Sequence, residues 1–169
     1  MWRHLHGVTV PQAVVAVAVR IGFLHADLGQ TLLRVLEVDP ADAIDAVEAA
    51  VNSGGLVLVE TPREAHWERK SIEVNWVKFS SRWDLLWALA RASKGGGSVD
   101  AFTLRERNEG DPKFVTKRKC RLVNTVGFPL TLADCVVSAG SGTYRIDVPR
   151  DRVRVFERGV GDEVREWTP

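Results

Sequence analysis

Residues 111–127, DPKFVTKRKCRLVNTVG, carry five cations and are predicted to form one helix that ends on a glycine. Asp111 can cap the start of this helix through its carboxylate, and Pro112 suits the first helical position, where no backbone donor is needed. Gly127 can adopt the left-handed conformation that ends a helix, and Pro129 prevents the helix from resuming. The sequence therefore predicts a capped cationic helix.

The two sides of this predicted helix differ in chemistry. At about 100° per residue, Val115, Leu122 and Val126 fall on one side, and Lys119 projects near them. The opposite side carries Lys113, Lys117, Arg121 and Asn124. A helix that packs its apolar side on a core can present such a cationic side, with its amide, to phosphates. The stretch thus indicates an anionic partner.

Charge is distributed unevenly along the 169 residues, of which 45% are hydrophobic and 27% charged. Residues 1–60 hold three Lys+Arg and seven Asp+Glu, a net charge of −4. Residues 61–169 hold 20 and 15, a net charge of +5, although the whole chain has a net charge of +1. This asymmetry indicates an anion-binding module joined to a unit that does not bind anions.

The sequence lacks the signatures of secretion, of a membrane span and of the common catalytic or metal sites. Cys120 and Cys135 are too few for a disulfide framework and are expected to be reduced thiols in a cytoplasmic protein. The apolar stretch at 10–24 is shorter than a membrane span and contains Arg20, so it is predicted to be a buried helix. Motifs of the types GxxxxGK[ST], GxSxG and HExxH are absent, and the four histidines show no metal-ligand spacing. We therefore expect no metal, no cofactor, no membrane association and no enzymatic activity.

The acidic N-terminal part is predicted to be a small, mainly helical unit over residues 1–62. Helices are expected at 11–24, at 28–36 and from Pro40 to the Gly54–Gly55 pair, and a short strand at 56–60 follows. The third helix carries Asp42, Asp45 and Glu48, which would repel phosphates. This unit, which could itself resemble a winged helix, is therefore expected to form a homodimer or to dock a protein partner.

The C-terminal part is predicted to begin after a polar connector at 63–70 and to end before a tail at 159–169. A strand is expected at 72–79, followed by a helix that buries Trp83, Leu86, Trp87 and Ala90 and ends at 94–97. A shorter helix with Phe102 should precede the cationic helix. Beyond it we expect one helical turn after Thr131, a hairpin of strands 136–139 and 143–148, and a strand at 153–156.

Residues 72–156 resemble the winged-helix DNA-binding domain at the C-terminus of OmpR/PhoB-type bacterial response regulators. The resemblance rests on the segments IEVNWVKF, WDLLWALARA and VDAFTL, the charged third helix, and a hairpin that ends in GTYRIDV. It implies an α+β fold with a winged helix-turn-helix over residues 71–158. It also implies that the third helix enters the major groove of double-stranded DNA, while the hairpin tip reaches the adjacent backbone or minor groove. The implied function is sequence-specific transcription regulation.

The candidate DNA-binding residues divide by their chemistry. Arg121 and Asn124 are candidates for base contacts, because arginine can read guanine and asparagine can read adenine. The candidates for phosphate contacts in the third helix are Lys113, Lys117 and Arg118. The candidates in and after the hairpin are Arg145, Arg150, Arg152 and Arg154. Alternation places Arg152 and Arg154 on one side of their strand, where they could bind successive phosphates.

Other interpretations of the same residues remain open at this point. The cations of the third helix could be a solvated outer face, and the arginine-rich strand could be an edge strand protected against aggregation. The alternative function is a protein–protein adaptor built on winged-helix units that do not bind DNA. A weaker alternative is a small nucleic-acid enzyme or its accessory subunit.

Overall fold

The computed structural model describes residues 10–25, 27–29, 31–32, 40–100, 104, 113–140, 142–158 and 164–169. The chain divides into two compact units: Met1–Asp45 with Arg158–Val164, and Ala46–Glu157 with Arg165–Pro169. Helices and strands occur together, which confirms the predicted α+β class. The division between residues 45 and 46 lies before the predicted connector at 63–70.

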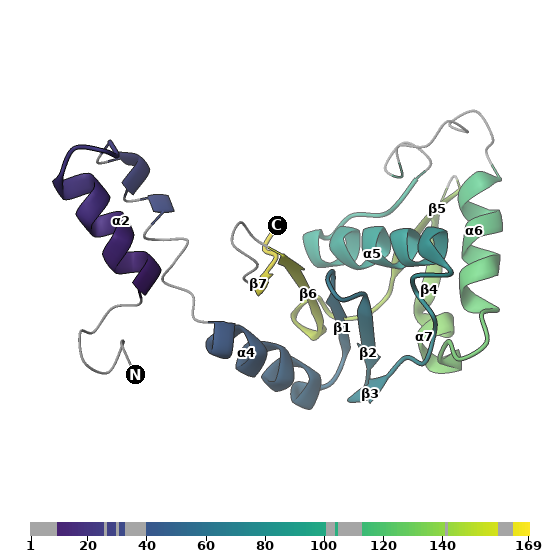
Figure 1. Cartoon of the computed structure of the whole chain (residues 1–169). Coiled ribbons are helices and arrows are strands. Elements are labelled where there is room, and N and C mark those ends of the chain that lie inside the picture. The colour runs from purple at the N-terminus through teal and green to yellow at the C-terminus, as the bar shows by residue number, and fades with distance from the viewer. Residues whose placement is uncertain are drawn as a thin grey trace. The chain divides into compact units, whose positions relative to one another are not determined.

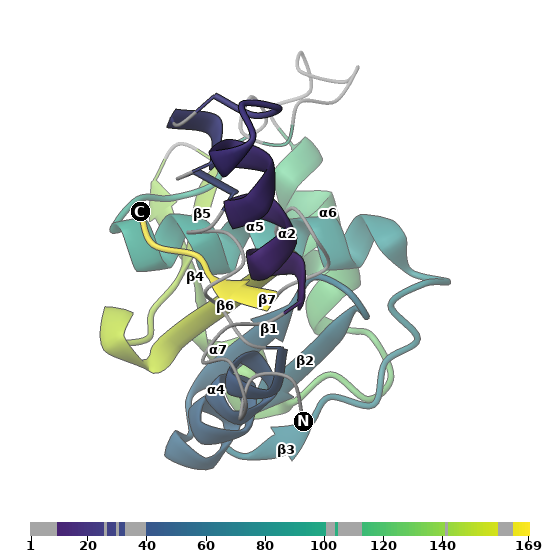
Figure 2. The same cartoon turned by 60° about the vertical axis from the view of Figure 1, so that its left-hand side comes forward.

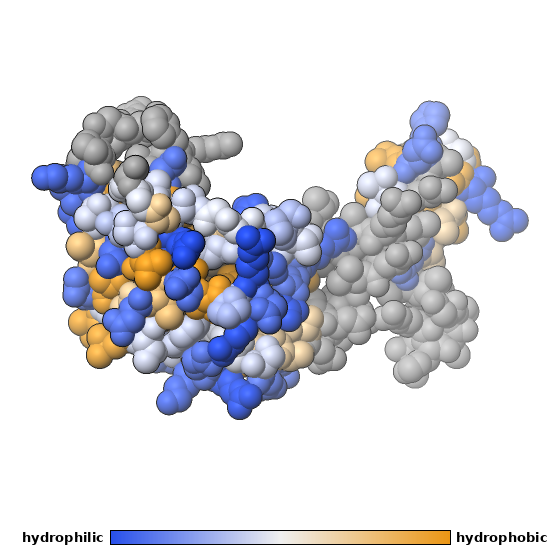
Figure 3. All heavy atoms as spheres, turned by 180° about the vertical axis from the view of Figure 1, so that it is seen from behind, coloured by the Kyte–Doolittle hydropathy of each residue, from blue (hydrophilic) through white to orange (hydrophobic). Residues whose placement is uncertain are grey.

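The N-terminal part contains α2, Val10–Arg20, and a helical segment at 27–29 and 31–32. α4, Pro40–Ser53, begins at the predicted proline and ends at the Gly54–Gly55 pair. The prediction that the first apolar helix is buried is wrong, because Val14, Val17 and Ile21 are between 57% and 72% exposed. Apolar residues lie around most of the circumference of α2, so a contact on one side of the helix leaves apolar residues on its other sides exposed. Figure 3 shows apolar residues at the surface of this part of the chain, on the right.

A five-stranded sheet with the order β3-β2-β1-β6-β7 organises the second unit. β1, Leu56–Val59, pairs antiparallel with β2, Glu64–Trp67, and β2 pairs antiparallel with β3, Lys70–Ser71. On its other side β1 pairs in parallel with β6, Val153–Arg158, so that Leu56 lies opposite Val153. β7, Val164–Glu166, is the outer strand next to β6. All four residues of β1 are buried, as expected for a central strand covered on both faces.

Among the described residues, this unit also contains the second half of α4, further helices and a hairpin. α5, Ser80–Gly95, contacts β1, β5 and α6, and Figures 1 and 2 show it running between the sheet and α6. α6 spans Phe114–Val123 and α7 spans Leu130–Cys135. β4, Val136–Gly140, and β5, Thr143–Ile146, form a separate two-stranded hairpin, and a 3-10 turn, η1, follows at Arg150–Arg152. Tyr144 of the hairpin also forms a bridge to Val99.

The core lies around α5. Leu85, Leu86 and Leu89 are completely buried, and Trp83 is 3% exposed. The rings of Trp76 and Trp83 have centroids 5.5 Å apart, and those of Trp83 and Trp87 are 5.6 Å apart. The predicted core role of Trp83 is therefore confirmed, and the half-buried Trp87 packs against the same cluster.

Two segments before α5 differ from the sequence-based prediction. The expected connector contains β2, whose Ala65 and Trp67 are buried because they face the core in alternation with the exposed Glu64 and the half-buried His66. The expected strand at 72–79 is irregular to residue 75 and then forms a turn at 76–79. Ile72 and Trp76 are buried while Val77 is 81% exposed, so burial still alternates as in a strand, but β3 ends at Ser71 and the backbone of 72–79 is not part of the sheet.

The order of α5, α6 and the β4–β5 hairpin agrees with the prediction. The short helix expected around Phe102, and the caps at Asp111 and Pro112, lie outside the described residues. The strand at 153–156 is present as part of β6, but β6 pairs with β1 and is not part of the hairpin. The winged helix-turn-helix therefore stays a prediction.

Candidate nucleic-acid interface

α6 separates an exposed cationic side from a buried apolar side. Its exposed residues, including those that directly flank the helix, are Lys113, Lys117, Cys120, Arg121 and Asn124. Val115 and Leu122 are buried, as predicted, and anchor the helix in the core. The prediction that Val126 is buried is wrong, because α6 ends at Val123 and the following turn carries Val126 out to 93% exposure. Gly127 has the expected positive φ, 88°, but it lies in this turn.

The side of α6 that faces the hairpin is held by Tyr144. The Tyr144 hydroxyl hydrogen-bonds the Thr116 hydroxyl at 3.1 Å. Lys119, which the helical projection placed near the core, is half-buried with its ammonium group 6.0 Å from the Tyr144 ring. The Arg118 guanidinium lies 4.8 Å from the Phe114 ring. These contacts restrain the rotation of α6 about its axis, while Lys113, Lys117 and Arg121 are exposed.

The end of α6 is tied to the start of α5. The Asn124 side-chain amide donates to the Cys120 carbonyl at 2.8 Å, and the Thr125 hydroxyl donates to the Arg121 carbonyl at the same distance. Arg82 of α5 in turn donates from Nη1 to the Thr125 hydroxyl oxygen at 3.1 Å. Sequence reasoning missed Arg82, because in the sequence it is one ordinary cation in the first turn of a core helix.

Two predicted phosphate ligands near the hairpin lie in different surroundings. Arg145 is exposed on β5 and pairs with Asp147 at 3.2 Å. Arg150 lies in η1, and its guanidinium occupies the space beside Gly96, which ends α5 with a φ of 79°. Arg150 therefore packs at the end of α5, whereas Arg145 belongs to the hairpin.

The last two predicted ligands, Arg152 and Arg154, form ion pairs within the five-stranded sheet region. Arg152 donates from Nη2 to both carboxylate oxygens of Glu68 at 2.9 Å. Arg154 forms a two-point pair with Glu166, with Nε 2.6 Å from Oε1, and Lys94 also pairs with this carboxylate. The edge-strand interpretation is wrong, because β6 lies between β1 and β7. We therefore do not place these two arginines on the same surface as α6.

Glu166 should make stability depend on pH. Partial burial acts to raise its pKa, but hydrogen bonds from Arg154 and Lys94, and their charges, offset burial and leave the pKa of Glu166 below its ordinary value. A lowered folded-state pKa means that the carboxylate stabilises the fold above the unfolded-state pKa, about 4.3, and that this contribution is lost as pH falls further.

We therefore expect the wild-type chain to be more stable than Glu166→Gln at pH 7, and the difference to shrink as pH falls from about 5 to about 3. Urea unfolding followed by tryptophan fluorescence at each pH measures this difference. A gap that stays constant over the range would contradict the proposed ion-pair contribution.

Other kinds of site have no support in the described part of the chain. No three His, Cys, Asp or Glu side chains gather there as metal ligands. Both cysteines are free thiols. Among the same residues, no helix is long and apolar enough to cross a bilayer.

The comparisons with known proteins identify no relative. No protein-family model matches the chain, and neither the curated proteins nor the solved structures contain a match.

Proposed function

We propose that this protein binds double-stranded DNA through the exposed side of α6 and acts as a sequence-specific transcription regulator. The observation that carries the proposal is the separation of the two sides of α6. Lys113, Lys117, Arg121 and Asn124 share its exposed side, while Val115 and Leu122 anchor the helix in the core. The ten residues of α6 include no aspartate or glutamate that would repel phosphates.

The size of α6 suits a groove. An α-helix with its side chains is about 10–12 Å across, and a major groove about 12 Å wide accepts an element of this diameter. In this proposal Lys113 and Lys117 neutralise phosphates and set the register of the helix on the duplex. Arg121, together with the amide group of Asn124, contacts base edges near the C-terminal end. Asn124 uses one amide hydrogen for the Cys120 carbonyl, which leaves its second N–H and its carbonyl oxygen for a base.

The hairpin contributes Arg145 to the same proposal. β4–β5 meets α6 through the bond between Tyr144 and Thr116, so Arg145 belongs to an element that is in contact with the helix. Arg118, which lies over the Phe114 ring, is a further candidate for a phosphate at this side. Arg150, Arg152 and Arg154 are omitted from the proposed interface because their contacts are with the end of α5, with Glu68 and with Glu166.

Salt dependence tests the proposal directly. Each neutralised phosphate releases counterions, so the logarithm of the association constant should fall with the logarithm of salt concentration by about 0.9 per phosphate. With three to four contacts from α6 and the hairpin, these elements should contribute about −2.7 to −3.6 to the slope. Fluorescence anisotropy of a labelled duplex between about 50 and 200 mM salt measures this slope. Absence of duplex binding at the lowest salt would refute the proposal.

A protein–protein adaptor is the second candidate function, and exposed apolar residues favour it. In the N-terminal part Val14, Val17, Ile21 and Phe23 are all more than half exposed, with Phe23 at 82%. Such a surface suits a homodimer or a protein partner, as predicted for this unit. The anisotropy titration distinguishes the two candidates, because an adaptor that does not bind DNA gives no salt-dependent duplex binding.

A further inference from the structure

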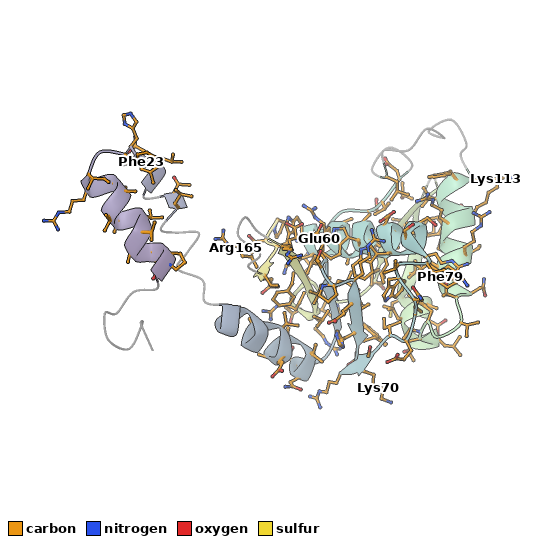
Figure 4. The ribbon with its side chains drawn as sticks, in the orientation of Figure 1. Phe23, Glu60, Lys70, Phe79, Lys113 and Arg165 are labelled. Atoms are coloured by element: carbon orange, nitrogen blue, oxygen red, sulfur yellow. The ribbon has the colours of Figure 1, made fainter. Side chains whose placement is uncertain are left out.

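We propose that the DNA-binding surface continues past the end of α6 onto the start of α5, where Lys78 and Arg82 contact phosphates. This inference rests on the proposed function and assigns it two ligands that the sequence did not indicate. Arg82 lies close to the C-terminal end of α6. Its bond to the Thr125 hydroxyl places the guanidinium next to the residue that follows Asn124. Figure 4 shows Lys113 at the opposite end of α6 from the region where Phe79 lies.

The guanidinium of Arg82 is held in place before any ligand binds. It lies 4.0 Å from the centroid of the Phe79 ring and donates one hydrogen bond, at 3.1 Å, to Thr125. Thr125 is 5% exposed and is itself fixed by its bond to the Arg121 carbonyl. An arginine restrained in this way loses little side-chain entropy on binding, and its remaining N–H groups can bind a phosphate in a two-point manner.

Lys78 brings a second positive charge to the same aromatic ring. Its ammonium group lies 5.5 Å from the Phe79 centroid, and its side chain is exposed. The Lys78 backbone N–H donates to the Asn75 side chain at 2.9 Å, which fixes the turn that carries it. Two cations therefore lie beside one aromatic ring at the start of α5, where together they can attract an anion.

Within the described part of the chain, no carboxylate lies within ion-pair distance of Lys78 or Arg82. The first turn of α5 also carries no acidic residue. By contrast, Arg63 close to the same helix has Asp84 at 3.9 Å, and Arg91 further along has Glu157 at 3.1 Å. Lys78 and Arg82 thus differ from Arg63 and Arg91, because no carboxylate of the described residues pairs with either of them. A phosphate of the duplex supplies the missing charge.

The spacing along α6 agrees with a duplex seated on this helix. Phosphate backbones run along both sides of the major groove, so cations near both ends of a helix seated in the groove can lie close to phosphates. In this proposal Lys113 contacts phosphates at the N-terminal end of α6, and Lys78 and Arg82 contact phosphates at its C-terminal end. Contacts of this kind carry no base preference and set the position of the duplex.

The test compares salt slopes for Lys78→Gln and Arg82→Gln with that of the wild-type chain. Each substitution should reduce the magnitude of the slope by about 0.9, and by the same amount for two labelled duplexes of unrelated sequence. Lys70→Gln is the matched control, because Lys70 is an exposed lysine on β3, and its slope should equal that of the wild type. Arg82→Lys keeps the charge but loses the guanidinium geometry, so it should keep most of the slope while weakening affinity. Thermal unfolding of each variant shows whether the fold is retained.

The outcomes separate this inference from the proposed function. If Lys78→Gln and Arg82→Gln both keep the wild-type slope while the wild type binds with salt dependence, the extension onto α5 is refuted and the role of α6 stands. If Arg82→Gln lowers thermal stability without changing the slope, Arg82 only holds Thr125, and the Lys78→Gln slope then decides the proposal. If the wild-type chain binds no duplex at low salt, both are refuted.

Discussion

Replacing Lys117 and Arg121 together with glutamate is expected to reduce duplex affinity by at least about 100-fold, because two attractive contacts become two repulsive ones. Both side chains are exposed on one side of α6, one helical turn apart. Neither side chain belongs to the core cluster, so the fold should be retained. Fluorescence anisotropy at low salt measures the affinity, and circular dichroism measures the helical content.

The control for this reversal is Arg20→Glu with Lys70→Glu. It changes the net charge by the same amount and also replaces one exposed arginine and one exposed lysine. Arg20 lies at the end of α2 and Lys70 in β3, so neither belongs to the proposed interface. Affinity should fall much less in this variant. Equal losses in the two variants would mean that overall charge governs binding, and retained binding in Lys117→Glu/Arg121→Glu would refute the role of α6.

The Gly55→Ala substitution is expected to cause a large loss of stability, about 2–6 kcal/mol. Gly55 has a φ of 89°, and a Cβ atom there would lie 2.3 Å from the Arg152 carbonyl oxygen. Strain at such a backbone angle costs about 1–3 kcal/mol, and displacing a packed backbone adds about 1–3 kcal/mol. The site immediately precedes the pairing of Leu56 with Val153, so any shift also disturbs the β1–β6 ladder. Urea unfolding followed by tryptophan fluorescence measures the loss.

Gly140→Ala provides the matched control for the collision. Gly140 has a φ of 97°, but a Cβ atom there would meet nothing within 4 Å. Its substitution should therefore show the cost of the backbone angle alone. If Gly55→Ala were no more destabilising than Gly140→Ala, close packing of Gly55 against Arg152 would not contribute to stability.

The elements that the sequence predicted well are those with strong local signals. α4 begins at Pro40 and ends at glycines, and α5 buries Trp83 and Leu86 at helical spacing. For α6, the spacing of Val115 and Leu122 correctly predicted which side is buried, and hence that the cations on the other side are exposed. The end of α6 was predicted less accurately, since Gly127 closes the turn that follows the helix.

The segment at 63–70 shows why some strands were not predicted from the sequence. β2 has only four residues, and its sequence, EAHW, lacks the β-branched residues that usually mark strands. The turn from β2 to β3 uses Glu68 and Arg69 at positive φ, where glycine or asparagine would have signalled a hairpin. These residues are held there by contacts made elsewhere, including the pair between Glu68 and Arg152.

By itself, the sequence indicated α4, α5 and α6 and separated the apolar residues of α5 and α6 from their polar ones, because residues three or four positions apart share a face in any helix. The tertiary structure decided which segments meet. β6 pairs with β1 about a hundred residues earlier, and no local periodicity specifies such a partner. With β6 in this position, Arg152 pairs with Glu68 and Arg154 pairs with Glu166. The packing of α5 on α6 brings Arg82 to the end of the cationic helix. The charge on an arginine is a property of the residue, but the anion that it meets depends on the fold.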